Sequence, residues 1–285
     1  MIVAIVGPTG VGKTKMSVEL AKKFDGIVIN CDAMQVYIGM DIGTAKVTED
    51  EKEGVPHYLF DICDVTKNYT VYDYQKDLRL LLEKYKDKNI FIVGGTGLYL
   101  KSGLFDFRFP LEENISNNYD ELTNEELYKM ALEKDKNMNI HVNNRKRLVR
   151  FLNKENIEIV EPKQLYNALF IGLTTDRENL YNIINNRVDK MFNNGLLEEA
   201  RKFYDMHIES KALSTAIGYK ELFEYFDGSI SLEEAKELIK QRSRRYAKRQ
   251  YTYFNNQLDV NWFNVDYDNF NNTINEVVEY IKKSS

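Results

Sequence analysis

The sequence predicts an α/β protein with a doubly wound parallel sheet. Apolar, β-branched runs alternate with amphipathic stretches through the first hundred residues, as they do where helices connect parallel strands. The first run, Ile2–Val6, leads directly into Gly7–Thr14, which fits the phosphate-loop pattern G-x-x-x-x-G-K-[ST]. An amphipathic segment, Lys15–Phe24, completes the strand–loop–helix setting that this motif requires. The fold class is therefore α/β of the P-loop type, with a helical insertion described below.

The phosphate loop predicts a site for a polyphosphate or a pyrophosphate. Its glycines let backbone N–H groups approach phosphate oxygens, and the following helix adds the positive end of its dipole. Lys13 can reach the terminal phosphate, and the Thr14 hydroxyl can bind Mg²⁺, the predicted cofactor. The predicted contacts are Gly7, Pro8, Thr9, Gly10, Val11, Gly12, Lys13 and Thr14.

Two further buried strands are predicted at Gly26–Asn30 and Asn89–Val93, with a helix over Tyr72–Tyr85 between them. Ligands of doubly wound sheets bind beyond the carboxyl ends of the strands. The residues after these two strands are therefore candidates for the site. Cys31 and Asp32 follow the first strand, and the glycine-rich segment 94–97 follows the second.

Asp32 and Thr96 lie in these two loops, and each is open to two interpretations. Asp32 could act as a general base or help to bind Mg²⁺, but an Asp after a strand is commonly a helix N-cap. Thr96, flanked by glycines, could approach a ligand closely or could cap a short helix at Leu98–Leu100. The strand before Thr96 lacks the terminal Asp that holds Mg²⁺ in many nucleotide hydrolases, which argues against simple ATP or GTP hydrolysis.

The composition pattern changes after Phe109. The stretch 110–164 is polar, rich in Asn and helical in tendency, and Thr123 with Glu126 fits a capping box. We predict a helical insertion over 110–164 in a catalytic core made of 1–109 plus 165–285. The elements expected after the insertion are a strand at Ala168–Leu173, long helices over Arg177–Asp205 and Leu232–Tyr253, a strand at Trp262–Val265 and a helix at Asn269–Lys283.

Composition places the chain among ordinary globular proteins, with 43% apolar and 29% charged residues. No apolar run approaches the ~20 residues that span a bilayer, and the N-terminal strand is unlike a signal peptide, so we expect a cytoplasmic protein without a membrane partner. Cys31 and Cys63 lack the spacing of a zinc site and, without a secretory signal, do not indicate a disulfide.

The net charge of −5 conceals two basic clusters, Arg145–Arg150 and Lys240–Arg249. In the second cluster Arg242, Arg245 and Arg249 share one helical face at i, i+3 and i+7. A solvated helix face explains most such runs. Two clusters in an otherwise acidic chain nevertheless favour a surface for a phosphate-rich polymer.

The chain resembles the bacterial tRNA dimethylallyltransferases, also called tRNA isopentenyltransferases. The matching motifs run in order along almost the whole chain, and the blocks G-M-D-I-G-T-A-K and A-I-G-Y-K-E are highly specific. The matches are Gly7–Thr14, Asp32–Tyr37 with Gly39–Lys46, Val55–His57, Gly94–Tyr99, Arg187–Asp189 with Met191 and Gly195–Leu196, Ala216–Glu221, and Tyr246–Gln250.

The resemblance implies transfer of a dimethylallyl group from dimethylallyl pyrophosphate to the exocyclic amine of the adenine 3′ of the anticodon in tRNA. The phosphate loop, although of the nucleotide-binding or ATP-binding type, would hold the pyrophosphate of this donor together with Arg187. Asp32 would be the general base, Thr96 would touch the reacting centre, and Mg²⁺ would sit on Thr14. We expect a monomer that binds the tRNA anticodon stem-loop.

The resemblance also implies two tRNA-binding segments. One is Asp32, Ala33, Met34 and Gln35, and the other is the basic helix Lys146, Arg147, Leu148, Val149 and Arg150. The basic face of Arg242, Arg245 and Arg249 is added to these from its charge pattern. The chain departs from the family at Val142 and Asn144, where a proline and an aspartate are usual, and its insertion is short.

Three alternatives compete with this interpretation. A P-loop small-molecule kinase explains the first motif and the sheet but not the basic helices. A prenyltransferase that uses free AMP, ADP or ATP as acceptor would not need the basic clusters or the helical module. A non-enzymatic RNA-binding protein would leave Lys13, Asp32 and Thr96 without a purpose.

Overall fold

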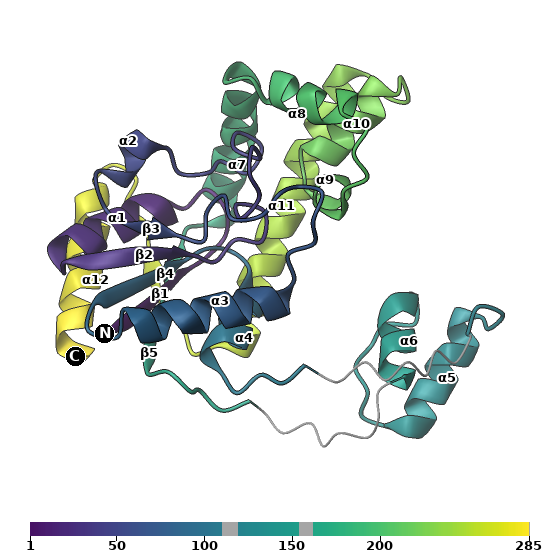
Figure 1. Ribbon diagram of the computed structural model, residues 1–285, viewed down its shortest axis with the longest axis horizontal. Helices are drawn as coiled ribbons and strands as arrows, with labels where there is room; N and C mark the ends of the chain where they lie inside the picture. Colours follow the sequence, from purple (N-terminus) through teal and green to yellow (C-terminus); the bar gives the residue numbers. More distant parts are fainter. Residues whose placement is uncertain (110–118, 154–161, 285) are drawn as a thin grey trace. The chain divides into compact units, whose positions relative to one another are not determined.

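A computed structural model describes residues 1–109, 119–153 and 162–284 (Figure 1). The chain forms two compact units. Unit 1 comprises Met1–Asp106 and Gln164–Ser285, and unit 2 comprises Phe107–Lys163. The insertion predicted at 110–164 overlaps unit 2, part of which lies outside the described residues.

Unit 1 is built on one parallel sheet, which confirms the predicted fold class. In the described part of the chain the sheet has six strands in the order β3-β2-β4-β1-β5-β6. The strands are β1 (Ile2–Val6), β2 (Gly26–Asn30), β3 (His57–Tyr58), β4 (Asn89–Val93), β5 (Ala168–Thr174) and β6 (Asn261–Asn264). The sequence did not predict β3, because two residues are too few for a recognisable pattern.

The strand register brings the candidate loops to one edge of the sheet. Asn30 at the end of β2 pairs with Val93 at the end of β4, and Val93 also pairs with Ile5 of β1. The phosphate loop, the Asp32 loop and the Thr96 loop therefore leave the sheet side by side, as expected for a ligand site in this architecture.

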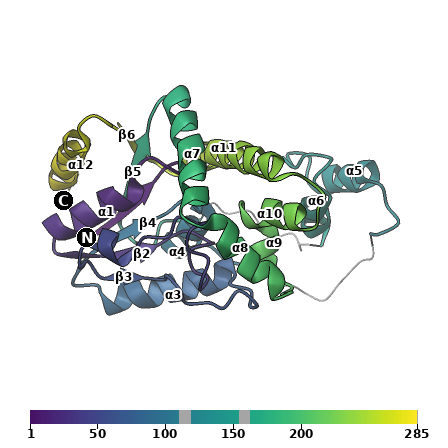
Figure 2. The ribbon, with the colours of Figure 1, turned by 90° about the horizontal axis from the view of Figure 1, so that it is seen from above.

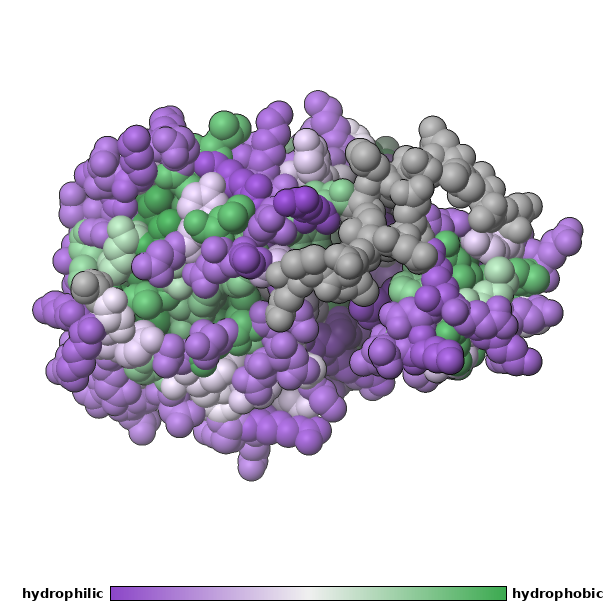
Figure 3. Space-filling model, turned by 90° about the horizontal axis from the view of Figure 1, so that it is seen from below, coloured by the Kyte–Doolittle hydropathy of each residue, from purple (hydrophilic) through white to green (hydrophobic). Residues whose placement is uncertain are grey.

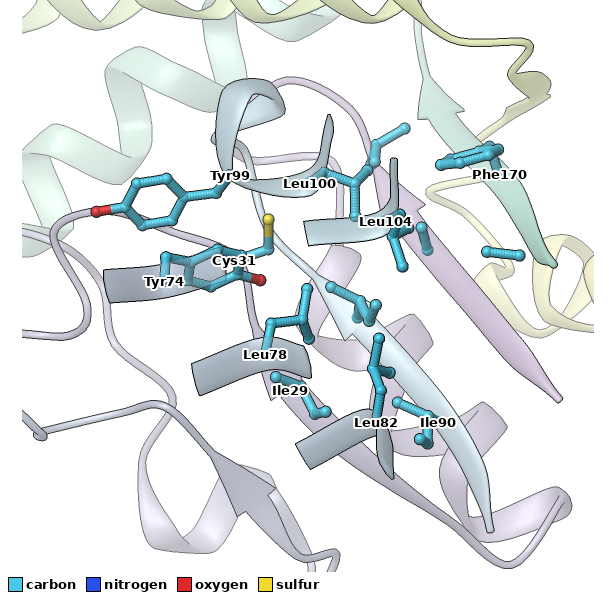
Figure 4. Close-up of a cluster of buried hydrophobic side chains, with 14 of the residues drawn as sticks. Ile29, Cys31, Tyr74, Leu78, Leu82, Ile90, Tyr99, Leu100, Leu104 and Phe170 are labelled. Atoms are coloured by element: carbon cyan, nitrogen blue, oxygen red, sulfur yellow. The ribbon is translucent and has the colours of Figure 1, made fainter. Parts of the chain in front are cut away.

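Helices cover both faces of the sheet (Figures 1 and 2). Helices α3 (Val71–Lys84) and α4 (Gly97–Leu104) pack on one face, where Tyr74, Leu78 and Leu104 are fully buried (Figure 4). Helices α1 (Lys13–Lys23) and α12 (Phe270–Ser284) pack on the other face, and the short α2 (Glu49–Lys52) precedes β3. Burial on both faces explains why these strands read as continuous apolar runs.

A group of helices follows β5 and forms its own hydrophobic cluster beside the carboxyl edge of the sheet. Its members are α7 (Arg177–Asn193), α8 (Leu196–Asp205), α9 (Lys211–Thr215), α10 (Tyr219–Phe226) and α11 (Leu232–Gln257). The single long helix predicted over Arg177–Asp205 is wrong, because the chain turns between α7 and α8 at Gly195, whose φ is 99°. Glycine adopts this left-handed conformation without steric cost.

Unit 2 contains two described helices, α5 (Asn124–Lys134) and α6 (Arg145–Leu152). Its fully buried side chains among the described residues are those of Leu127, Ala131 and Leu148. The predicted capping box is confirmed, since the Thr123 side chain accepts from the N–H of Glu126 and the Glu126 side chain accepts in return. Packing of α5 on α6 in unit 2 therefore rests on a small hydrophobic core.

The surface is largely hydrophilic on the side displayed in Figure 3, with hydrophobic side chains in separate patches. Across the described ranges, no helix is both long and apolar enough to cross a bilayer.

Candidate active site

The main cavity of unit 1 lies at the carboxyl edge of the sheet and has a volume of about 520 Å³. It is lined by the phosphate loop, the loops after β2 and β4, the loop around Thr44, and helices α7 and α11. The predicted site residues in its wall are Thr9, Gly10, Gly12, Lys13, Thr14, Asp32, Ala33, Met34, Gln35, Arg187 and Arg249. Gly7, Pro8, Val11 and Thr96, which were also predicted, do not line the cavity.

Lys13 of the phosphate loop is half-buried and hydrogen-bonded to the backbone of its own loop. The Lys13 ammonium donates to the carbonyls of Gly7 at 3.0 Å and Pro8 at 2.7 Å, so it lies folded over its own loop. Burial, and then the positive charge of Arg187, lower the pKa of Lys13 to about 7. Gly7 makes the tight exit from β1 possible, because a Cβ there would lie 2.4 Å from the Leu173 carbonyl oxygen.

Arg187 comes from α7 and crosses the cavity to the phosphate loop. Its guanidinium donates to the Thr9 hydroxyl at 2.5 Å and to the Thr44 carbonyl at 3.3 Å. Burial lowers the pKa of Arg187, and the negative charge of Asp32 opposes this shift. Two partly desolvated cations next to each other favour an anionic ligand between them.

Asp32 is fixed by a turn directly after β2. Its N–H donates to the Asn30 side chain at 2.9 Å, and one of its carboxylate oxygens accepts from the N–H of Met34 at 2.9 Å. The segment after Asp32 is a turn, so the N-cap interpretation of this residue is wrong. The turn holds the carboxylate in the cavity wall, near enough to Lys13 and Arg187 to interact with both charges.

Thr96 occupies the N-cap position of α4, but its side chain does not cap that helix. The hydroxyl instead accepts from the N–H of Ala33 at 3.0 Å, which ties the end of β4 to the Asp32 turn. Thr96 does not line the cavity, and its hydroxyl supports the turn that holds Asp32.

A carboxylate that sequence reasoning did not select holds the loop around Thr44 in place. Glu199 of α8 accepts from the backbone N–H groups of Asp41, Ile42 and Gly43 at 3.1, 2.8 and 2.9 Å. The Tyr219 hydroxyl donates to the same carboxylate at 2.6 Å. The sequence signalled its two partners, which lie in the specific motif blocks 39–46 and 216–221, but not the carboxylate that joins them.

The predicted basic face of α11 divides into different environments. Arg249 lines the cavity, and Arg245 is exposed. Arg242 pairs with Glu221, whose side chain is 1% exposed, so this arginine also stabilises the packing of α10 on α11. Arg245 and Arg249 are therefore more accessible to a ligand than Arg242, which is held in an ion pair.

The predicted basic helix of unit 2 is α6. The side chains of Lys146, Arg147 and Arg150 are exposed, and Val149 is half-buried. Leu148 is fully buried between α5 and α6, so its side chain supports the helix and is not available to a ligand.

The fold is of the P-loop type, and its cavity brings the phosphate loop and the carboxylate of Asp32 together. The model of the family described as IPP transferase matches residues 35–257. The chain is 42% identical over 298 residues to the tRNA dimethylallyltransferase of Anoxybacillus flavithermus, covering 99% of this chain and 96% of the relative. It is 46% identical to that of Enterococcus faecalis, covering 93% and 91%.

Solved structures agree with these relatives. The full-length tRNA isopentenylpyrophosphate transferase from Bacillus halodurans superposes with a TM-score of 0.78 at 42% identity, covering 99% of this chain and 95% of that one. A eukaryotic dimethylallyltransferase described as acting on tRNA gives a TM-score of 0.77 at 27% identity, covering 92% and 73%. This chain belongs to the IPP transferase family and is a prenyltransferase, so the kinase and non-enzymatic alternatives are excluded.

Proposed function

We propose that this protein transfers the dimethylallyl group of dimethylallyl pyrophosphate to the exocyclic amine of the adenine 3′ of the anticodon in tRNA. The strongest support for the proposal is the composition of the cavity. A single cavity joins two cations, Lys13 and Arg187, to the carboxylate of Asp32. The cations suit a departing pyrophosphate, and the carboxylate suits an amine that must lose a proton.

The reaction forms a bond between the amine nitrogen and C1 of the allyl group and breaks the bond between C1 and the pyrophosphate oxygen. Pyrophosphate leaves with the electron pair, and its growing charge is stabilised by Lys13, Arg187 and the loop N–H groups. Asp32 accepts the proton from the amine, which is a poor nucleophile because its lone pair is delocalised into the ring. The hydrogen bond from the Met34 N–H, which holds the Asp32 carboxylate in place, supports this role.

The chemistry of the cavity wall fits Mg²⁺. The described residues contain no group of three or more His, Cys, Asp or Glu side chains that could hold a metal. Mg²⁺ is commonly bound through one or two protein oxygens with the remainder from phosphates and water, and Thr14 supplies such an oxygen beside Lys13. When bound, the ion would neutralise pyrophosphate charge as it develops.

The acceptor must enter the cavity as an unstacked base, which costs a few kcal/mol and needs a grip on the surrounding tRNA. Ala33, Met34 and Gln35 line the cavity and would contact the base. Arg249 at the wall, and Lys146, Arg147 and Arg150 on unit 2, would bind phosphates of the anticodon stem-loop. We expect a monomer to suffice in the cytoplasm, since one chain supplies every group named.

A transfer assay tests the proposal. Purified protein is mixed with labelled dimethylallyl pyrophosphate, Mg²⁺ and either unmodified tRNA or AMP. We expect label in tRNA but not in AMP. Label in AMP alone would make the protein a nucleotide prenyltransferase, and label in neither would refute both assignments.

A further inference from the structure

Gln250 bridges the two halves of the active site. It lies on α11, is 4% exposed, and uses both polar atoms of its carboxamide. Its Oε1 accepts from the N–H of Thr9 in the phosphate loop at 3.0 Å. Its Nε2 donates to the Gly95 carbonyl, in the loop after β4, at 3.1 Å.

Each end of this bridge continues to a group with an assigned role. At the phosphate-loop end, the hydroxyl of Thr9 also accepts from Arg187. At the other end, Gly95 precedes Thr96, whose hydroxyl accepts from the N–H of Ala33, the residue after Asp32. One carboxamide thus links the loop that would hold the pyrophosphate to the turn that holds the carboxylate.

The surroundings are fitted to a carboxamide at this position. The two backbone partners require one acceptor and one donor at once, which an ionised carboxylate cannot offer. A Cβ on Gly95 would lie 1.8 Å from the Gln250 Nε2, and the three nearest atoms to it all belong to Gln250. Gly95 is therefore small because Gln250 occupies the adjoining space.

We propose that Gln250 is a positioning residue that sets the spacing between the donor pyrophosphate and the Asp32 carboxylate. The inference rests on the proposed function. Gln250 lines the cavity, but both polar atoms of its carboxamide bond to backbone groups, so the residue acts through Thr9 and Gly95. Its loss should reduce the rate of the chemical step more than the binding of either substrate, since misplacement by about 1 Å can cost ~100-fold in rate.

The first test compares Gln250→Met with Gln257→Met. Both change a glutamine of α11 to an apolar residue of similar length, but Gln257 bonds only to the exposed Lys101 ammonium among the contacts described for it. We expect kcat to fall ~30- to 100-fold in Gln250→Met, with less than ~3-fold change in either KM, and no change in Gln257→Met. Unchanged kcat, or a raised KM with normal kcat, would overturn the proposal.

The second test separates positioning from general destabilisation. Gly95→Ala alone should reduce kcat as strongly as Gln250→Met, because the new methyl group displaces the carboxamide. In a Gln250→Ala background the same methyl group meets open space, so Gly95→Ala should cost less than ~3-fold more. Additive losses would refute the bridge, and Gly95→Ala alone keeps the proposal testable if Gln250→Met does not fold, because wild-type kcat in Gly95→Ala would also contradict it.

A third variant, Gln250→Glu, tests the need for a donor. Protonated glutamate offers one O–H donor and one carbonyl acceptor, so it can restore both bonds. The ratio of its kcat to that of the wild type should rise as pH falls from 8 to 6, by up to ~10-fold per pH unit. A constant ratio would contradict the bridge. Wild-type transfer to tRNA is measured alongside, so a failure of the proposed reaction is seen separately.

Discussion

Two regions rich in positive charge are built in different ways. In unit 1, Lys13 and Arg187 are fixed by hydrogen bonds to backbone and side-chain oxygens of the phosphate loop and of the loop around Thr44. In unit 2, Arg147 and Arg150 project from a short helix that rests on three fully buried side chains. On the proposed function this difference has a physical reason. Stabilising a leaving group requires charges that are held in place, whereas binding the backbone of a nucleic acid requires mainly that charges be present and accessible.

The largest effect on activity should come from a substitution in the cavity of unit 1. Asp32→Asn keeps an oxygen to accept from the Met34 N–H but removes the base, so kcat should fall ~10²- to 10⁴-fold. tRNA binding, measured by filter retention, should stay within ~3-fold of wild type. A loss of kcat below ~10-fold would remove Asp32 as the base.

A second large effect should separate donor binding from acceptor binding. Lys13→Ala removes the ammonium that would bind the pyrophosphate on the proposed function. We expect the KM for dimethylallyl pyrophosphate to rise ~100-fold or more, since a charge-assisted contact in a desolvated site is strong. tRNA affinity should not change. Normal donor affinity in this variant would mean that the loop holds another group.

A smaller effect is expected from the pH dependence of donor affinity, which should depend on Lys13 and not on the exposed arginines of unit 2. Because the pKa of Lys13 is lowered to about 7, its ammonium loses its proton as pH rises above 7, and donor affinity should fall by up to ~10-fold per pH unit. Lys13→Arg is the control, because its guanidinium stays charged and its profile should be flatter. Isothermal titration from pH 6 to 9 measures both, and parallel profiles would contradict this prediction.

The smallest effects should come from unit 2. Arg147→Ala with Arg150→Ala should weaken tRNA binding several-fold and reduce the slope of log K against log salt by roughly 1 to 2, with kcat unchanged. Lys129→Ala with Lys136→Ala removes the same charge from other exposed positions of this unit. An equal loss in both pairs would show that α6 is not the binding face.

The sequence predicted what local patterns determine. β1, β2 and β4 have the predicted bounds, because strands buried on both faces read as continuous apolar runs. The turn at Gly195 interrupts a helical pattern without changing its amphipathic character, which is why one helix was predicted where two exist.

The parts of the site that the sequence did not predict depend on distant partners. Glu199 and Gln250 resemble ordinary helical residues, and only the folded chain shows the backbone groups that they bind. The same holds for Thr96, whose hydroxyl finds its donor in another strand-end loop. No periodicity or spacing records a contact of this kind.

The contact between Gln250 and Thr9 has a consequence for the timing of synthesis. The two residues are 241 positions apart, so at ~5–20 residues per second the ribosome adds the second roughly 10–50 s after the first. During that interval the phosphate loop exists without one of its supports. The N-terminal part of the chain therefore carries the phosphate-loop motif before the site can form. The contact to the loop is made only after helix α11 has been synthesised.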